Sequence, residues 1–189
     1  MIKKIEMPYT RDTLAELEAG DSVLITGVIY TARDAAHKRL TEMLDRGEAL
    51  PFALEGAMLY YAGPTPEKPG RPIGAVGPTT SYRMDAYAPR LLDLGQAGMI
   101  GKGQRNQDVK DAVVRNGAVY LAAVGGAGAL IAKSVRASEV VAFEDLGAEA
   151  VRRLTVVDFP AIVVIDSRGE DLYELGRQAY LGSRGKGKA

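Results

Sequence analysis

A dense run of polar side chains that could bind an anion occupies residues 77–85, with the sequence Gly-Pro-Thr-Thr-Ser-Tyr-Arg-Met-Asp. Its arginine, Arg83, could grip a planar carboxylate through two parallel hydrogen bonds. The hydroxyls of Thr79, Thr80 and Ser81 could each cap a helix, but one cap needs only one hydroxyl. The surplus of hydroxyls therefore favours a binding or catalytic function for this run.

Turns of this kind occur four times, each where a strand pattern ends and a helix pattern begins. They cover residues 30–34, 77–85, 101–104 and 125–128. Helix N-termini present unpaired N–H groups and the positive end of the helix dipole, which suits anions. Three of the turns also carry a cation, namely Arg33, Arg83 and Lys102. If several of these helix ends converge on one cleft, they would bind a small polyanion, either a dicarboxylic acid or a phosphate.

The same three cations also have a structural interpretation, which spacing alone favours. Arg33 could pair with Asp34 or with another surface acid. Arg83 could do the same with Asp85, or Asp85 could orient Arg83, and Lys102 could be solvated. Both interpretations stay open at the level of residue spacing.

Two weaker candidates are better explained by structure. The glycine-rich stretch at residues 125–128 lacks the spacing of a dinucleotide-binding loop, so close packing of a helix against the sheet is the favoured explanation. His37 falls one helical turn after Arg33, where a surface or structural histidine is favoured over a catalytic one.

Composition excludes several classes of function. With 24 basic and 24 acidic residues, the chain has no bulk charge that would attract nucleic acid or an anionic membrane. It contains no cysteine, which excludes disulfides and cysteine-bound clusters within this chain, and its single histidine argues against a histidine-based zinc site. No apolar run is long enough to span a bilayer and no signal peptide opens the chain, so we expect a cytoplasmic protein.

The hydrophobic patterns predict an α/β protein with one domain over residues 1–181 and a basic, disordered tail over 182–189. Helices are predicted over residues 10–20, 31–46 (opened by a capping box at Thr31), 84–94, 104–115 and 128–135. Strands are predicted over residues 22–29, 57–62, 73–76, 98–100, 118–124, 140–143, 155–159 and 161–165. Because the last strands follow one another without helices, a mixed sheet or small barrel flanked by helices fits better than a doubly wound sheet.

The run at residues 77–85, followed by Gly-Lys-Gly at 101–103, resembles the C-terminal domain of class I, iron–sulfur-dependent fumarases. In two-chain members of that family the domain is a separate β subunit, as in L-tartrate dehydratase. The stretches 20–27, 31–37, 125–130 and 143–147 share the likeness, which extends over residues 3–175.

This resemblance implies a swivelling β/β/α fold and a hydro-lyase, which adds water reversibly to fumarate to give L-malate, a step of the citric acid cycle. It also implies a partner α subunit that holds a [4Fe–4S] cluster through three cysteines, with one open iron as a Lewis acid. The chain would then be the half without the cluster. Because it begins at a Met just before the domain, we expect a separate α subunit. The resemblance also implies a hetero-oligomer, a heterotetramer with two copies of each subunit.

Carried over residue by residue, the resemblance assigns the three cations and one hydroxyl. Arg33, Arg83 and Lys102 match substrate-contacting cations, and Thr79 matches a hydroxyl proposed as the catalytic base. Thr80 or Ser81 could be the actual contact, and this chain would bind no metal itself.

Two alternatives to fumarate hydration stay open. The substrate could be L-tartrate or a related dicarboxylic acid, since substrate choice depends partly on the α subunit. The chain could also be a non-catalytic module that binds a dicarboxylate or a phosphate without any partner.

Overall fold

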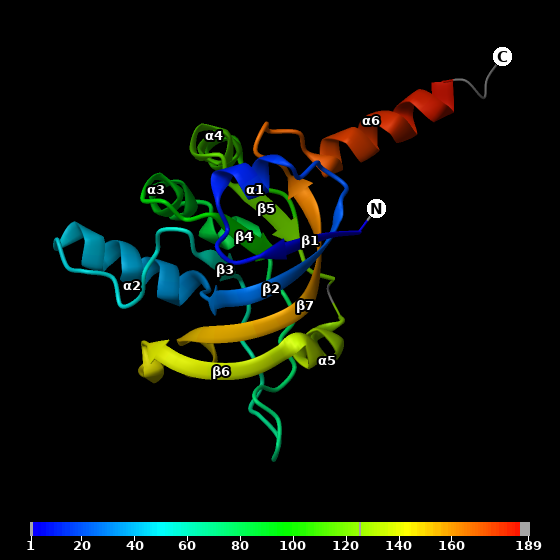
Figure 1. The fold of residues 1–189 in the computed structure, drawn as a ribbon. Coiled ribbons are helices and arrows are strands. Elements are labelled where there is room, and N and C mark those ends of the chain that lie inside the picture. Colours follow the sequence, from blue (N-terminus) through cyan, green and yellow to red (C-terminus); the bar gives the residue numbers. More distant parts are fainter. Residues whose placement is uncertain (1, 125, 186–189) are drawn as a thin grey trace.

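Five strands close into a small mixed barrel at the centre of the molecule, and helices flank it (Figure 1). The computed structural model of the chain describes residues 2–124 and 126–185. The strands are β1 (Ile2–Glu6), β2 (Ser22–Thr31), β3 (Met58–Tyr60), β4 (Gly98–Gly101), β5 (Val119–Ala122), β6 (Val135–Ala142) and β7 (Val151–Ile165). The α-helices are α1 (Arg11–Ala15), α2 (Asp34–Asp45), α3 (Ala88–Asp93), α4 (Gln107–Asn116), α5 (Gly128–Ile131) and α6 (Leu172–Gly185), and the 3-10 helices are η1 (Ser81–Met84), η2 (Ala132–Ser134) and η3 (Glu144–Glu149). The α/β class and the small mixed barrel predicted from the sequence are confirmed.

The barrel closes because β2 pairs with other strands along both of its edges. One edge pairs in parallel with β1 and, further along, with β3, while the other edge pairs antiparallel with β7. β3, β4 and β5 follow in parallel, and β5 pairs with β7 to complete the ring. The carboxyl ends of β2, β3, β4 and β5 consequently lie at the same end of the barrel.

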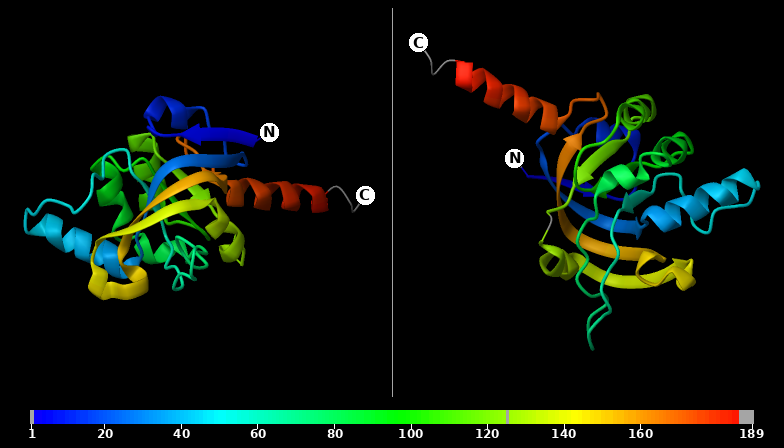
Figure 2. Two further views of the ribbon diagram at one scale, coloured as in Figure 1. Left: turned by 60° about the horizontal axis from the view of Figure 1, so that its bottom comes forward. Right: turned by 180° about the vertical axis from the view of Figure 1, so that it is seen from behind.

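Two apolar cores result, one inside the barrel and one beneath the helices. Inside the barrel, Tyr60 packs edge-on against Phe159, with the ring centroids 5.2 Å apart. Its neighbour Tyr61 belongs to the other core, shared with α2, α3 and α4, which lie together on one side of the barrel (Figure 2). Both faces of β3 are therefore buried, which explains why residues 57–62 are apolar without alternation.

β7 runs without interruption through Pro160, so the prediction of two strands divided at this proline was wrong. Proline has no N–H to donate and is tolerated in a sheet where one strand edge is open. β6 pairs with β7 only as far as Val156, and β5 pairs with it only from Ile162 onwards. Pro160 lies in the intervening stretch, where β2 is the one partner strand.

The capping box predicted at Thr31 was also wrong. Thr31 is the last residue of β2, and its hydroxyl donates to the Ala150 carbonyl at 3.3 Å and accepts the Arg152 amide at 3.0 Å. The hydroxyl therefore ties β2 to the start of β7, and α2 begins at Asp34 with Arg33 as its N-cap.

Two other predicted elements differ from the structure. Residues 73–76 form no strand, and the Val76 amide instead donates to the Gly128 carbonyl at 3.1 Å. The helix predicted over residues 84–94 begins later, as α3 at Ala88, after η1 has ended at Met84. Pro89 suits the first turn of this helix rather than the interior of a longer one.

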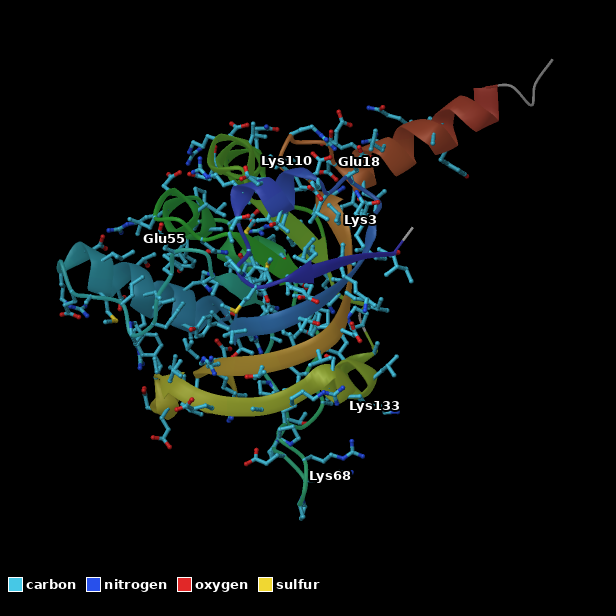
Figure 3. All side chains as sticks on the ribbon, viewed as in Figure 1. Lys3, Glu18, Glu55, Lys68, Lys110 and Lys133 are labelled. Carbon is cyan, nitrogen blue, oxygen red and sulfur yellow. The ribbon has the colours of Figure 1, made fainter. Side chains whose placement is uncertain are left out.

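α6 projects away from the barrel and was not predicted from the sequence (Figure 1). Lys110 of α4 is labelled in Figure 3. It anchors the base of α6 through ion pairs with Asp171, at 2.7 Å, and with Glu174. The helix continues to Gly185, so it includes the first residues of the segment for which composition predicted disorder, and residues 186–189 lie outside the described residues. None of the helices in the described part of the chain is long and apolar enough to cross a membrane.

The first residue of α5 approaches the segment 76–77 too closely for any side chain. A Cβ atom added to Gly128 would lie 2.8 Å from the Gly77 amide nitrogen, so the backbone would have to move. We expect Gly128→Ala to lower the free energy of unfolding by about 1–3 kcal/mol, measured by urea denaturation. Gly176→Ala is the matched control, because open space surrounds Gly176 in α6 and its denaturation midpoint should not fall. Wild-type stability in Gly128→Ala would contradict the close approach.

Of the glycine-rich stretch at residues 125–128, Gly125 lies outside the described residues.

Candidate functional site

The carboxyl ends of the parallel strands bring the predicted anion-binding residues to one end of the barrel. Arg33 follows β2, Gly63 follows the extension of β3, and Lys102 follows β4. A Cβ atom on Gly63 would lie 3.1 Å from Nη1 of Arg33, so this guanidinium passes over the end of β3. Ligands of α/β sheets commonly bind at this end of the strands.

The polar run at residues 77–85 crosses the same end between β3 and β4. The Thr79 amide donates to the Tyr61 carbonyl at 2.7 Å, and Thr80 forms a parallel bridge with Lys102. The side chains of both threonines are partly exposed, and within the described residues their hydroxyls form no hydrogen bond. Thr79 and Thr80 therefore offer two uncommitted hydroxyls beside Lys102.

Arg83 and Lys102 are the two predicted cations that remain available. Both side chains are exposed, and neither forms an ion pair with any residue that the structure describes. The interpretation in which Arg83 pairs with Asp85 was wrong, because Asp85 pairs with Arg105. Two cations on hydrogen-bonded segments, each without a carboxylate partner among the described residues, suit an anionic ligand.

Arg33 has partners within the protein. Its Nη2 lies 3.3 Å from Oε1 of Glu149 and 3.6 Å from Oδ1 of Asp34. The structural interpretation, in which Arg33 pairs with Asp34, is confirmed, although Nε of Arg33 is buried without a partner among the described residues. Glu149 was missed because it lies far away in the sequence, next to the start of β7.

The two longer helices that begin at this end are already occupied by carboxylates of the protein itself. Oε2 of Glu149 accepts the amide of Ala35 in the first turn of α2, at 3.1 Å. Oδ2 of Asp85 accepts the amide of Asn106, the N-cap residue of α4, at 2.8 Å. These helix ends therefore do not supply the anion site that the turn patterns predicted, and side-chain cations are the groups left to do so.

A buried ion pair underlies the exposed cations. Nε of Arg105 donates to Oδ1 of Asp85 at 2.6 Å, and the guanidinium lies over the rings of Tyr61 and Tyr120, 5.4 and 5.1 Å from their centroids. The expectation that Asp85 orients Arg83 was wrong. Arg105 was not predicted from the sequence, because its only distinguishing feature there is its position three residues after Lys102.

Ser81 is fully buried and belongs to this lower layer. Its hydroxyl accepts the Lys102 amide at 3.0 Å and lies 2.9 Å from the hydroxyl of Tyr120. The Ser81 hydroxyl thus has a structural contact in place of the open position expected for a ligand-binding group. Its effect on a ligand would act through Lys102.

His37 is structural and completely buried, so the interpretation as a surface residue does not apply. Its Nδ1 lies 2.9 Å from the Arg33 carbonyl, and desolvation lowers its pKa to about 4 against the opposing effect of that hydrogen bond. His37 is therefore neutral at pH 7. Across the residues that the structure describes, no group of three or more His, Cys, Asp or Glu side chains could hold a metal ion.

Burial of neutral His37 predicts a loss of stability in mild acid. The unfolded chain takes up this proton near the ordinary pKa of 6.5 and the folded chain only near 4, so stability falls as the pH drops through this window. The free energy of unfolding that is lost across this window because of His37 is roughly 3 kcal/mol. His37→Gln should show a smaller fall in the free energy of unfolding between pH 7 and 4.5, measured by urea denaturation. Because His37 is the only histidine, an unchanged slope would contradict this assignment.

Removal of one partner of the buried ion pair should be costly. Asp85→Asn leaves the Arg105 charge buried without compensation, and we expect a loss of about 3–5 kcal/mol in the free energy of unfolding. The matched control is Asp93→Asn, which breaks the exposed ion pair with Arg115 and should hardly change the denaturation midpoint. Equal losses in the two variants would show that burial of the Asp85 pair does not matter.

Comparison with known proteins places this barrel in a family. The family model described as Fumarase C-terminus matches residues 2–176. The chain is 39% identical over 165 residues to Fumarate hydratase 2 of Leishmania major and 39% identical over 163 residues to the anaerobic class I fumarate hydratase of Escherichia coli K12. These matches cover 86% and 85% of the chain, but only 29% and 30% of those longer proteins.

A shorter relative matches over nearly its whole length. The chain is 40% identical over 171 residues to a putative L(+)-tartrate dehydratase subunit beta of Methanocaldococcus jannaschii, and the match covers 87% of the chain and 88% of that protein. The chain thus spans about 30% of the length of the fumarate hydratases named above and most of this subunit. It belongs to the Fumarase C-terminus family.

Proposed function

We propose that the chain is the β subunit of a cytoplasmic hydro-lyase that hydrates fumarate reversibly to L-malate together with a cluster-bearing α subunit. Family membership and the relatives named fumarate hydratases support this reaction class. The relative named as a β subunit supports a two-chain enzyme, and a heterotetramer with two copies of each chain is the proposed assembly.

The observation that carries the proposal is the exposure of Arg83 and Lys102, neither of which forms an ion pair with a described residue. Lys102 lies where β4 ends and forms a bridge with Thr80, and Arg83 lies in the adjoining segment, whose Ser81 amide donates to the Lys102 carbonyl. A four-carbon dicarboxylate carries two negative charges, and an arginine fork and a lysine point charge could hold them. Arg33 is proposed as a further substrate contact from the family resemblance, and its guanidinium would then share its charge between the substrate and Glu149.

The chemistry of the reaction gives these groups distinct roles. In the dehydration direction the proton beside a carboxylate leaves, and its electron pair spreads into that carboxylate before the hydroxyl departs. Arg83 and Lys102 would stabilise the charge that develops there. Thr79 would accept the proton, which requires nearby cations that favour its alkoxide.

The residues of this chain do not fit an iron–sulfur cluster. Such clusters are held by cysteine thiolates, and the chain has no cysteine. The [4Fe–4S] cluster of the proposal is therefore assigned to the α subunit, where its open iron would supply a Lewis acid. This chain supplies the substrate-binding cations.

L-Tartrate is the second candidate substrate, favoured by the match along nearly the whole length of a tartrate dehydratase β subunit. The deciding experiment mixes this chain with its cluster-reconstituted α subunit under anaerobic conditions. Loss of fumarate absorbance is followed, with L-tartrate tested in parallel. Turnover of fumarate that requires both chains would support the proposal. Turnover of L-tartrate but not of fumarate would show that L-tartrate is the substrate.

A non-catalytic module would behave differently in the same preparation. It would bind L-malate, fumarate or phosphate tightly without the α subunit, as measured by calorimetry of this chain alone. The half-site proposal expects weak binding by the lone chain, because one end of the substrate is then not held.

Arg83→Ala should lower kcat/KM of the assembled enzyme by about 10²–10³-fold, because it removes a charge that stabilises the transition state. Assembly should persist, since Arg83 is exposed and unpaired among the described residues. Arg11→Ala is the matched control, because Arg11 is an exposed arginine beside Gly56, Gly95 and Gly117, at the opposite end of the barrel. Full activity of Arg83→Ala would remove Arg83 from the proposed site.

A further inference from the structure

Two segments that carry the available cations are tied together at both of their ends. At the first end, the Ser81 amide donates to the Lys102 carbonyl at 2.9 Å, and the Ser81 hydroxyl accepts the Lys102 amide at 3.0 Å. At the second end, Asp85 holds Arg105 and the amide of Asn106. The segments 81–85 and 102–106 therefore form one unit, which carries both Arg83 and Lys102.

Tyr120 of β5 supports this unit from below. Its side chain is fully buried, and its hydroxyl oxygen lies 2.8 Å from the Gly103 carbonyl and 2.9 Å from the Ser81 hydroxyl. Burial raises the pKa of Tyr120 well above its ordinary value, so the hydroxyl keeps its proton and has one hydrogen to donate.

The direction of each hydrogen bond follows from the chemistry of its ends. A carbonyl only accepts, so Tyr120 donates to Gly103, and an amide N–H only donates, so Lys102 donates to Ser81. The Tyr120 hydroxyl also donates toward the Ser81 hydroxyl, at 2.9 Å, so its one hydrogen is shared between Gly103 and Ser81. A continuous chain of hydrogen bonds thus runs from the amide of Lys102 to the carbonyl of the next residue.

Lys102 needs such support because glycines flank it on both sides. Gly103 has a φ of 86°, which few other residues adopt, and the backbone of glycine is intrinsically the least restricted. A Cβ atom on Gly101 would lie 2.0 Å from Oγ of Ser81, so Gly101 cannot be replaced by a stiffer residue without moving the serine. Hydrogen bonds, rather than backbone stiffness, hold this lysine in place.

We infer that Tyr120 is a positioning residue for Lys102: through Ser81 and the Gly103 carbonyl it fixes the backbone from which the lysine reaches the dicarboxylate. The inference rests on the proposed function. Tyr120 itself touches no substrate, because it lies beneath the Ser81–Lys102 contact.

The test uses the assembled two-subunit enzyme. Tyr120→Phe keeps the ring and removes the hydroxyl, and we expect kcat/KM for the dicarboxylate to fall about tenfold, the scale of one buried hydrogen bond. Tyr9→Phe is the matched control, because Tyr9 is another buried tyrosine, at the opposite end of the barrel, and its hydroxyl has no hydrogen-bond partner among the described residues. Its kcat/KM should equal that of the wild type.

A double-mutant cycle separates positioning from a general loss of structure. In a Lys102→Ala background, Tyr120→Phe should cause no further loss, whereas in an Arg33→Ala background it should still cost about tenfold. Where turnover of a double variant is too slow to follow, the dissociation constant for succinate, measured by calorimetry, replaces kcat/KM. Additive losses of Tyr120→Phe and Lys102→Ala would overturn the inference.

Two further measurements keep the result interpretable. If Tyr120→Phe does not assemble, Ser81→Ala removes the next link of the same chain and should show the same coupling to Lys102→Ala. If the wild-type enzyme turns over neither fumarate nor L-tartrate, the proposed function has failed independently. The amides of residues 102 and 103 should then still exchange hydrogen about tenfold faster in Tyr120→Phe than in the wild type, and equal exchange would overturn the inference as well.

Discussion

Antiparallel pairing between β2 and β7 is the interaction on which the rest of the structure depends. It runs from Ser22 opposite Ile162 to Thr31 opposite Arg152, and it turns an open sheet into a barrel. Because β3, β4 and β5 are then held in parallel between these two strands, the loops that follow them emerge at one end. Residues that are far apart in the sequence, such as Arg33 and Glu149, become neighbours there.

Ion pairs and hydrogen bonds within the protein determine which charged groups at that end can still bind a ligand. Asp85 pairs with buried Arg105 and accepts a hydrogen bond from an amide at the start of α4. Glu149 likewise pairs with Arg33 and accepts a hydrogen bond from an amide at the start of α2. The starts of α2 and α4 and the charges of Arg33 and Arg105 are thereby compensated within the chain. The exposed side chains of Arg83 and Lys102 keep a positive charge that faces solvent, and a dicarboxylate can neutralise it.

Much of the fold was predictable, because buried strands and amphipathic helices leave local patterns. The strand at residues 22–29 and the helix at 104–115 were placed correctly to within a few residues. Pro160 was misread, since its tolerance depends on which edge of β7 is unpaired, and that is a property of the neighbouring strands. Thr31 was misread for a related reason, because its hydroxyl bonds to β7 rather than to its own helix.

The sequence by itself determined the chemical inventory: hydroxyls and cations in the run at 77–85, a lysine between two glycines, and no cysteine. Only the tertiary structure decided which of these groups are committed. Arg33 pairs with Glu149, and Ser81 is buried against Tyr120, both partners being distant in the sequence. Arg83 and Lys102 stay exposed. Residue type and spacing specify what a side chain can bind, but ion pairs and burial depend on distances in space that only the closed barrel defines.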